Sequence, residues 1–337
     1  MPKARLRRGM KAVEISSFGG PRVLRICERP RPEPTAGEVL VRVSTAGVAR
    51  ADTLQRQGKY PPPQGASDIP GLDVAGCVES IGPGVQNIQP GQRVCAILAG
   101  GGYAEYCVAP QQQVLPIPEN WTEIEAATLP ENIFTAFDNL ITRAGLKSGE
   151  SALIHGGTSG VGSMAIMLAK AWNARVIATA GSQEKCRACR DFGSDAAINY
   201  REGDFVEAAR AFTSGHGVDV VLDLVGGAYL ARNLDALALE GCISIIATQG
   251  GRTAELDIGR LMMKRARIMG STMRARTPSQ KGEVAARLLK QVWPLLPSKT
   301  VIRPAIDRVY PLQEAWRAHE RMESGEHIGK IVLTIDR

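Results

Sequence analysis

A short apolar run that leads through a glycine-rich turn into a helical stretch constrains this chain more than any other feature. The run Ser151–His155 comes first, and a stretch with helical spacing, Val161–Trp172, follows the turn. Glycines let the backbone approach a pyrophosphate closely, and the free N–H groups at a helix start favour its negative charge. The spacing Gly157-x-x-Gly160-x-Gly162 differs from the common G-x-G-x-x-G, so the flanking strand and helix support the interpretation. Together they predict a dinucleotide site.

Strands alternate with helical stretches from about Gly149 onward. This alternation indicates βαβ units and a doubly wound parallel sheet, the Rossmann arrangement. The six strands are expected at Ser151–His155, Arg175–Thr179, Ala197–Tyr200, Val218–Asp223, Ile243–Ala247 and Arg267–Ser271.

The first part of the chain follows a different pattern. Short β-branched runs such as Glu38–Val43 and Gln92–Leu98 are separated by Gly and Pro at close intervals, which is typical of a barrel-like all-β unit. A length of 337 residues is enough for two domains. After an amphipathic run at Ser279–Trp293, the β-like stretch Lys330–Ile335 is expected to return to the first domain as a terminal strand.

The end of the second Rossmann strand determines the choice of cofactor. NAD enzymes place an Asp or Glu there, on the ribose 2′-hydroxyl. This chain has Ser182 instead, with Lys185 and Arg187 on the following turn, so a 2′-phosphate meets no carboxylate and we expect NADPH. The alternative is that Lys185 and Arg187 form a solvated helix face. The cofactor contacts expected from these two segments are Gly157, Ser159, Gly160, Val161, Gly162, Gly181, Ser182 and Lys185. Tyr200, which ends the third strand, is expected to pack on the adenosine end of the cofactor, with simple packing at the strand end as the alternative.

Several other chemistries lack their residues. The sequence Gly157–Val161 fails the G-x-S-x-G pattern of a hydrolase elbow at its last position. No Tyr stands four residues before a Lys, as a short-chain reductase needs. The four histidines are dispersed, and none pairs with Cys at metal-ligand spacing, so no metal site is expected. The pair Cys186 and Cys189 lies in a helical run without a second pair, which favours chance placement.

Composition limits the compartments and the kinds of partner that fit this protein. Seven scattered cysteines fit a reducing compartment, and we expect a cytoplasmic protein that does not enter membranes, because no apolar stretch approaches about 18 residues. The net charge is +7, and Lys3, Arg5, Arg7 and Arg8 contribute four positive charges to a basic N-terminal segment that we interpret as a flexible tail. Aromatic residues make up only 5%, which argues against nucleic-acid binding.

The order of a β-rich domain, a glycine turn in the second half and a returning strand is similar to that of a known superfamily. The chain resembles the medium-chain dehydrogenase/reductases, specifically their zinc-free quinone oxidoreductases related to zeta-crystallin, and most of all the tumour-suppressor-inducible branch. The resemblance runs from Met10 to the C-terminus. The segments that carry it are Met10–Val13, Ala51–Pro63, Pro70–Gly76, Gly156–Gly162 and Gly329–Leu333.

The resemblance implies an α/β fold in which a GroES-like β-barrel catalytic domain accompanies the Rossmann domain. Zinc enzymes of the superfamily carry a catalytic Cys near Ala49 and Gly-His-Glu where this chain has Gly71-Leu72-Asp73, so both ligands are missing. Hydride delivery to an acceptor that is already electrophilic, such as a small quinone, then remains. The expected division is a tail at 1–9, the catalytic domain at 10–131, the Rossmann domain at 132–302 and a return to the catalytic domain at 303–337.

The resemblance also assigns site residues. It places the nicotinamide and the acceptor between the domains, near Asp52, Tyr60, Asn132 and Thr135. It places Thr248, Gln249, Gly250, Thr272, Arg274 and Lys330 beside the cofactor. The residues alone also allow Asn132 and Thr135 to be polar groups at a helix start, and Tyr60 to be loop packing. The family usually has Asn where this chain has Ala49, so the loss of that amide either reduces activity or changes the preferred substrate.

Two alternatives stay open at this stage. An enoyl or alkenal reductase shares the fold and the hydride but needs a proton donor, for which Tyr60 is available. A cofactor-binding protein with little turnover, acting as a structural or RNA-binding partner through the basic tail, is the other. Family likeness also implies a homodimer through the edge strand at Arg267–Ser271.

Overall fold

The computed structural model describes residues 9–335, which form two compact units. Unit 1 contains the described residues up to Glu131, together with Arg274–Pro297 and those from Pro304 onward. Unit 2 contains Asn132–Met273 and Ser298–Arg303. The expected basic tail lies, apart from Gly9, outside the described residues. No helix in the described part of the chain is both long and apolar enough to pass through a membrane.

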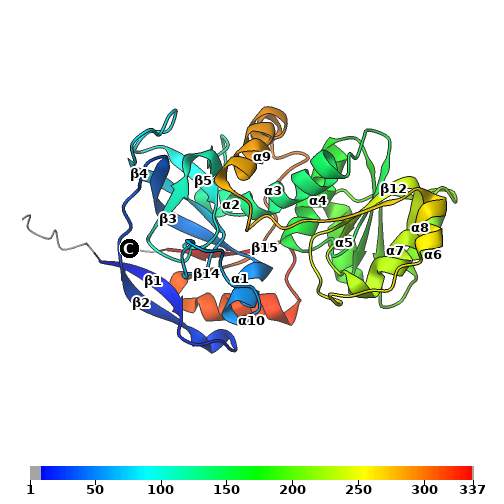
Figure 1. Cartoon of the computed structure of the whole chain (residues 1–337), viewed down its shortest axis with the longest axis horizontal. Helices are drawn as coiled ribbons and strands as arrows, with labels where there is room; N and C mark the ends of the chain where they lie inside the picture. The colour runs from blue at the N-terminus through cyan, green and yellow to red at the C-terminus, as the bar shows by residue number, and fades with distance from the viewer. Residues whose placement is uncertain (1–8, 336–337) are drawn as a thin grey trace, which may run out of the picture. The chain divides into compact units, whose positions relative to one another are not determined.

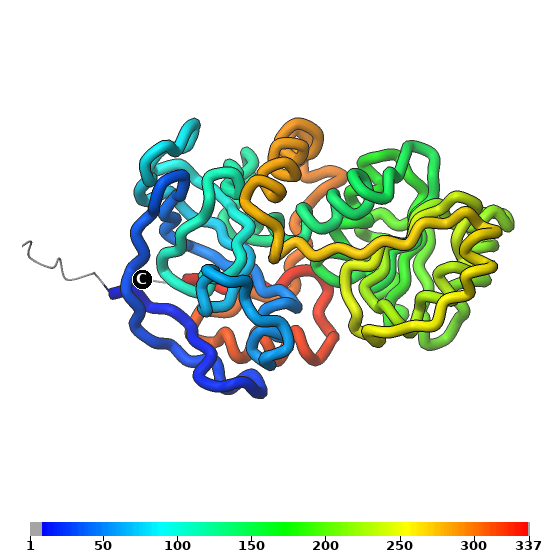
Figure 2. The backbone as a smooth tube through the Cα atoms, viewed as in Figure 1, coloured from blue at the N-terminus to red at the C-terminus, as the bar shows by residue number. Residues whose placement is uncertain are grey.

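Unit 1 differs from the expected catalytic domain in one segment. The sequence analysis placed residues 274–297 in the Rossmann domain, whereas the structure places Arg274–Pro297 in unit 1. Helix α9 (Pro278–Gln291) packs against the 3-10 helix η2 (Gln111–Gln113). Two indoles secure the segment, since Trp293 donates to the carbonyl oxygen of Pro116 at 2.9 Å and Trp121 donates to that of Leu296 at 2.8 Å. In Figure 2 this segment is coloured orange.

A seven-stranded sheet forms the centre of unit 1. Its order is β14-β15-β3-β4-β5-β7, and β6 also pairs with β3. Strand β15 runs antiparallel to β3 with Ile331 opposite Val48, so the predicted return of the C-terminal strand is confirmed. The strands are β3 (Glu38–Val48), β4 (Asp73–Ile81), β5 (Arg93–Ile97), β6 (Tyr106–Pro110), β7 (Val114–Pro116), β14 (Ile306–Pro311) and β15 (Lys330–Thr334).

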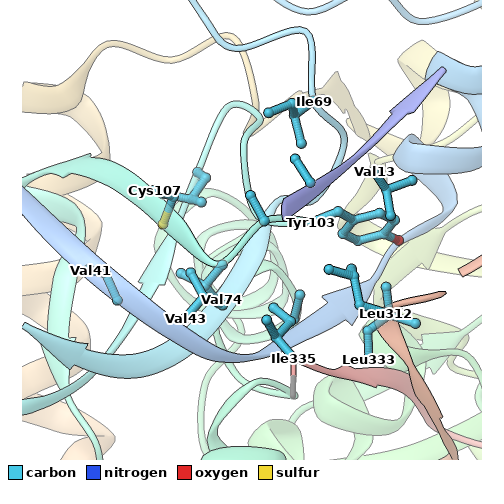
Figure 3. Packing of buried hydrophobic residues seen from close by; sticks show 14 of the residues in the cluster. Val13, Val41, Val43, Ile69, Val74, Tyr103, Cys107, Leu312, Leu333 and Ile335 are labelled. Carbon is cyan, nitrogen blue, oxygen red and sulfur yellow. The ribbon is translucent and has the colours of Figure 1, made fainter. Parts of the chain in front are cut away.

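Alternating inward side chains of these strands build the core of unit 1. Figure 3 shows Val43, Val74, Leu333 and Ile335 gathered with the ring of Tyr103 in one buried cluster. A two-stranded ribbon and the helices of unit 1 surround the sheet. These elements are β1 (Gly9–Ile15), β2 (Leu24–Pro30), α1 (Arg50–Arg56), α2 (Glu123–Ala126) and α10 (Ala315–Ser324).

Unit 2 contains the predicted parallel sheet. Its strand order β10-β9-β8-β11-β12-β13 is the 3-2-1-4-5-6 order of a doubly wound dinucleotide fold. Figure 1 shows strand β12 of this sheet with helices around it. The strands are β8 (Ser151–Ile154), β9 (Arg175–Ala180), β10 (Ala196–Asn199), β11 (Val218–Asp223), β12 (Leu237–Ile245) and β13 (Arg267–Gly270). The helices are α3 (Pro130–Phe137, which begins in unit 1), α4 (Gly160–Ala171), α5 (Gln183–Asp191), α6 (Phe205–Phe212), α7 (Leu230–Ala236) and α8 (Ile258–Lys264).

Short polar side chains fix where the helices of unit 2 begin. Ser159 accepts from the amide of Gly162 at the start of α4, and Ser182 accepts from the amide of Lys185 at the start of α5. Asp204 accepts from two amides at the start of α6. Each such cap satisfies an amide that has no partner within its helix. The first turns of α4 and α5 are therefore held firmly where they follow strands β8 and β9.

Candidate functional site

The expected cofactor residues of unit 2 follow the carboxyl ends of its strands. The turn Gly156–Ser159 follows β8, Gly181 and Ser182 follow β9, and Tyr200 follows β10. The segment Thr248–Gly250 comes after β12, and Thr272 comes after β13. Because the strands are parallel, these segments share one edge of the sheet, where doubly wound folds bind ligands. The structure thus brings the unit 2 predictions together.

The glycines of the turn are required by close packing. A Cβ at Gly157 would lie 2.7 Å from the sulfur of Cys189 and 2.9 Å from the Cβ of Ala178. A Cβ at Gly162 would lie 2.2 Å from the carbonyl oxygen of Gly156. The turn is therefore pressed against β9 and α5. The amides of Gly157 and Ser159 already donate to carbonyl oxygens of the protein, so the start of helix α4 is the surface expected for a pyrophosphate.

A buried network of hydrogen-bonded polar side chains holds this turn in place. His155, at the end of β8, is hydrogen-bonded through Nδ1 to the hydroxyl of Thr179 at 3.0 Å and through Nε2 to Oδ1 of Asn233 at 2.7 Å. Asn233 donates in turn to Asp223, whose other oxygen accepts from the amides of Val225 and Gly226. Burial lowers the pKa of His155 to about 4. The network therefore ties the turn after β8 to the loop after β11 through a neutral histidine.

The region expected to bind the ribose contains groups that favour a 2′-phosphate and a carboxylate that opposes one. Ser182 caps α5, and Gly181 leaves room for Tyr200, since a Cβ at Gly181 would lie 2.8 Å from the Tyr200 hydroxyl oxygen. The sequence analysis missed Glu202, which accepts from the side-chain nitrogen of Gln183 at 2.6 Å. No local motif marks this carboxylate, because it reaches α5 from the next loop.

The loop after β12 is held by the loop after β11. The amide of Gly250 donates to the carbonyl oxygen of Val225 at 2.7 Å, and that of Gly227 donates to Gly251 at 2.9 Å. A Cβ at Gly226 would lie 3.0 Å from the Cα of Thr248. Thr248 and Gln249 are both exposed. The backbone of this segment therefore has a defined position at the strand edge.

Helix α3 presents two further predicted residues to unit 2. A Cβ at Gly160 would lie 2.8 Å from the amide group of Asn132, so Asn132 covers the start of α4. The hydroxyl of Thr135 is buried and has no hydrogen-bond partner among the described residues. A buried hydroxyl costs stability unless something bonds to it. An orphaned hydroxyl and a cradle of glycines together fit a bound nicotinamide dinucleotide.

In unit 1, Asp52 is fully buried and already bonded. Its carboxylate accepts from the amides of Ala49 and Gly71 at 2.8 and 2.9 Å, and from the Tyr103 hydroxyl at 3.2 Å. The Tyr103 oxygen also contacts Nε2 of His319 at 3.2 Å. Ala49 occupies the N-cap position of α1 and has no side-chain acceptor for the helix amides. These contacts indicate that Asp52 anchors α1 and the loop at Gly71.

Arg274 holds the loop that carries Tyr60. Its buried guanidinium donates to the carbonyl oxygens of Ala99 at 2.8 Å and Tyr60 at 3.2 Å, and to the side-chain oxygen of Gln55 at 2.6 Å. It also lies 5.3 Å from the centre of the Tyr60 ring. The structure thus gives Arg274 a role within unit 1, in which it orients the Tyr60 loop.

Lys330 belongs to an ion cluster that the sequence analysis missed. Its ammonium lies 2.5 Å from Oδ2 of Asp73 and 3.8 Å from Oε2 of Glu131. The amide of Glu131 donates to the other Asp73 oxygen at 2.5 Å. Burial works to lower the pKa of Lys330, but the carboxylates of Asp73 and Glu131 outweigh it and raise that pKa. No sequence pattern shows this cluster, because its members lie far apart in the chain.

Comparisons with known proteins identify the family. Residues 35–119 match the alcohol dehydrogenase GroES-like domain, and residues 160–291 match the zinc-binding dehydrogenase family. Quinone oxidoreductase of Lama guanicoe is 32% identical over 97% of this chain and 98% of its own length. The chain belongs to the medium-chain dehydrogenase/reductase superfamily. It is an oxidoreductase with a nicotinamide cofactor, and the GroES-like and Rossmann domains are both confirmed.

Two solved structures illustrate the range of the family. The mycobacterial protein Rv1454c, complexed with NADPH, has a TM-score of 0.84 and 32% identity, covering 96% of this chain and 99% of its own. The JamJ enoyl reductase has a TM-score of 0.86 and 26% identity, covering 98% of this chain and 100% of its own. The predicted likeness to the tumour-suppressor-inducible branch stays a prediction.

The described residues contain no group of three or more His, Cys, Asp or Glu side chains arranged to hold a metal. At the two positions where zinc enzymes of the superfamily have Cys and His, this chain has Ala49 and Leu72, both buried. Neither side chain can ligate a metal ion.

Proposed function

We propose that the protein is an NADPH-dependent quinone reductase that passes a hydride to a small quinone. The observation that carries the proposal is the apolar pair Ala49 and Leu72, which replaces the usual metal ligands and calls for an acceptor that is electrophilic without a metal. The quinone oxidoreductase named above supports this acceptor class, and the complex of Rv1454c supports NADPH.

In this proposal the chain contributes binding and orientation. When bound, the reduced nicotinamide supplies the hydride. The glycine turn and the first turn of α4 would hold the pyrophosphate, and Ser182, Lys185 and Tyr200, which follow or begin the neighbouring elements, would hold the 2′-phosphate. Thr135 donates its free hydroxyl to the nicotinamide end, and Asn132 covers the start of α4. Thr248–Gly250 and Thr272 border the cofactor from the neighbouring strand ends.

Assays of the full chain test the proposal. NADPH and NADH binding is titrated by fluorescence, and oxidation of each is followed with 1,2- and 1,4-quinones. The proposal expects tighter binding of NADPH and turnover with at least one quinone class. Binding of NADPH without turnover of any quinone removes the quinone reductase, and absence of nucleotide binding removes the cofactor site as well.

Enoyl or alkenal reduction is the second candidate, supported by the similarity to the JamJ enoyl reductase. Tyr60 is held in place by Arg274 and has a hydroxyl to offer to the α-carbon. For this candidate, Tyr60→Phe abolishes alkenal reduction while leaving quinone reduction in place. A wild-type protein that reduces no alkenal excludes it.

A further inference from the structure

The ion cluster of unit 1 brings two acids, Asp73 and Glu131, to one ammonium. Asp73 on β4 and Glu131 on α3 face the Lys330 ammonium on β15. Two more titratable groups interact with the cluster. The carboxylate of Asp52 on α1 raises the pKa of Glu131, and the carboxylate of Glu131 raises the pKa of the Tyr60 phenol. Cys95 on β5 is a buried thiol whose pKa burial and the Asp73 carboxylate raise to about 12. Asp73 and Glu131 therefore share the Lys330 ammonium, whereas the Asp52 carboxylate also interacts electrostatically with the Arg274 guanidinium.

The three carboxyl groups differ in the hydrogen bonds and ion pairs that they make and in their exposure to solvent. Asp52 accepts from two backbone amides and a phenol, and Asp73 accepts from an amide and pairs with Lys330 at 2.5 Å. Both are fully buried. Among the described residues, the carboxylate of Glu131 has the longer 3.8 Å contact with Lys330 as its ion pair, and its side chain is 22% exposed. Of the three carboxyl groups, Glu131 is therefore the one best placed to bind a proton and to exchange it with solvent.

Glu131 also interacts with Tyr60, one of the residues assigned to the acceptor. It precedes Asn132 on helix α3, one turn before Thr135. Its charge is felt by the Tyr60 phenol, because burial raises the pKa of Tyr60 and the Glu131 carboxylate raises it further against the opposing charge of Arg274. A carboxyl group at this place is therefore close enough to act on a side chain that is expected to contact the acceptor.

We propose that Glu131 is the proton source for the reduced acceptor, with Lys330 and Asp73 holding its carboxyl in position. The proposal rests on the proposed function. A quinone that gains a hydride, which carries two electrons, needs one proton to become the hydroquinone. The O–H bond of the Glu131 carboxyl breaks, the proton goes to the quinone oxygen, and the resulting carboxylate recovers a proton from solvent. No further oxidant or reductant takes part.

Direct titration of the carboxyl is the first test, because it does not depend on turnover. Burial, reinforced by Asp73 and Asp52 and opposed by Lys330, raises the pKa of Glu131 to about 7. Infrared difference spectra of the full chain should show a protonated carboxyl band that disappears as the pH rises through 7. Glu131→Gln should remove that band. Glu119→Gln, which makes the same charge change at an exposed position of unit 1, should keep it.

The pH profile of quinone reduction is the second test. In the wild type and in Glu119→Gln, kcat should fall as the pH rises through about 7, because the proton is then lost. Glu131→Gln should lower kcat by about 100-fold, flatten the profile and leave the dissociation constant for NADPH unchanged. Glu131→Asp keeps a titrating carboxyl, so it should keep the sloping profile at a reduced kcat, and it serves if Glu131→Gln does not fold.

The outcomes separate this proposal from the proposed function. Quinone turnover by Glu131→Gln with the wild-type rate and pH profile overturns the role of Glu131 and leaves the quinone reductase standing. A carboxyl band that survives in Glu131→Gln overturns it as well. A wild type that binds NADPH and shows the titrating band, yet reduces no quinone, contradicts the proposed function instead.

Discussion

Ser182 combines two roles that one substitution can separate. Its hydroxyl caps helix α5 by accepting from the amide of Lys185, and it stands where the 2′-phosphate of NADPH is expected. Aspartate caps a helix as well as serine does but adds a negative charge. Ser182→Asp should therefore keep the fold while lowering the affinity for NADPH by about tenfold or more, which is about 1.4 kcal/mol, and sparing NADH.

Isothermal titration of both nucleotides checks this prediction, with Ser182→Asn as the matched control. Asparagine is also a good N-cap and carries no charge. Equal NADPH affinities for the Asp and Asn variants would contradict a 2′-phosphate position beside residue 182. Glu202, whose carboxylate accepts a hydrogen bond from Gln183 on α5, would then be the next position to substitute.

His155 should give the stability of the protein a measurable dependence on acid. Its pKa is lowered from the ordinary 6.5 to about 4, chiefly by burial. Between pH 6.5 and pH 4 the unfolded chain therefore binds a proton that the folded chain does not. This proton lowers the free energy of unfolding by about 1.4 kcal/mol for each pH unit of acidification in that window.

His155→Gln removes this contribution and so should show a shallower decline between pH 6.5 and pH 4. Its absolute stability at neutral pH should be lower, because the edge contacts of the imidazole with Phe205 and Tyr229 are lost. Urea unfolding at several pH values measures both quantities. His216→Gln, at an exposed position, serves as the control and should follow the wild-type slope; identical slopes for all three proteins would refute the assignment.

At the scale of elements, the β8–turn–α4 segment depends on the absence of a side chain at Gly157. A Cβ there would lie under 3 Å from both Cys189 on α5 and Ala178 on β9, and neither is the flexible end of a long side chain. Gly157→Ala should therefore destabilise the protein by about 1–3 kcal/mol and weaken nucleotide binding, because the turn must move outward.

Gly203→Ala provides the control for this prediction. A Cβ at Gly203 would lie 3.7 Å from the nearest atom, an ordinary contact with Ile198, so the change should leave both stability and binding close to wild type. Chemical denaturation and nucleotide titration of the two variants give the comparison. An unaltered Gly157→Ala protein would mean that the turn can accommodate a side chain without moving.

The elements themselves were largely predictable where one local pattern determines them. Strand β11 at Val218–Asp223 matches its prediction, and the other Rossmann strands except β12 match within one residue at each end. Strand β12 runs from Leu237 to Ile245 rather than from Ile243 to Ala247. Its first half was missed because an irregularity, with Glu240 at a positive φ of 63° and a register shift in the pairing with β11, interrupts the apolar pattern there. Residues 274–297 were assigned to the wrong unit because the two indole bonds that place them join distant segments.

The candidate site was predictable to the same extent. The glycine turn and the cap at Ser182 follow from neighbours in the chain, so their residues could be named in advance. The bonds of Asp52 to Gly71 and Tyr103, and the grouping of Glu131 with Asp73 and Lys330, arise only when strands β3, β4 and β15 pair. Tertiary pairing of this kind leaves no periodic signal in a single sequence.

At the scale of the whole molecule, unit 2 ends in a strand with an open side. Strand β13 pairs with β12 alone among the described strands, and neighbouring helix α8 exposes Met262 and Met263, at 71% and 83%. Open edge strands recruit further strands. We therefore expect a homodimer in which β13 pairs with its counterpart in a second copy, with twice the chain mass of 36.1 kDa in light scattering.

The direction of the backbone groups identifies a substitution that tests this assembly. The amide of Ser271 donates to Ile245 on β12, so the amides of Met269 and Arg267 also face β12, and those of Ile268 and Gly270 face outward. Gly270→Pro removes an outward donor, and a Cβ there would meet only the Ile245 oxygen at 3.8 Å. This variant should stay folded and behave as a monomer, whereas Ala197→Pro, which removes an outward donor from the opposite edge strand β10, should remain dimeric. A Gly270→Pro protein with the mass of the wild-type dimer would show that β13 is not the interface.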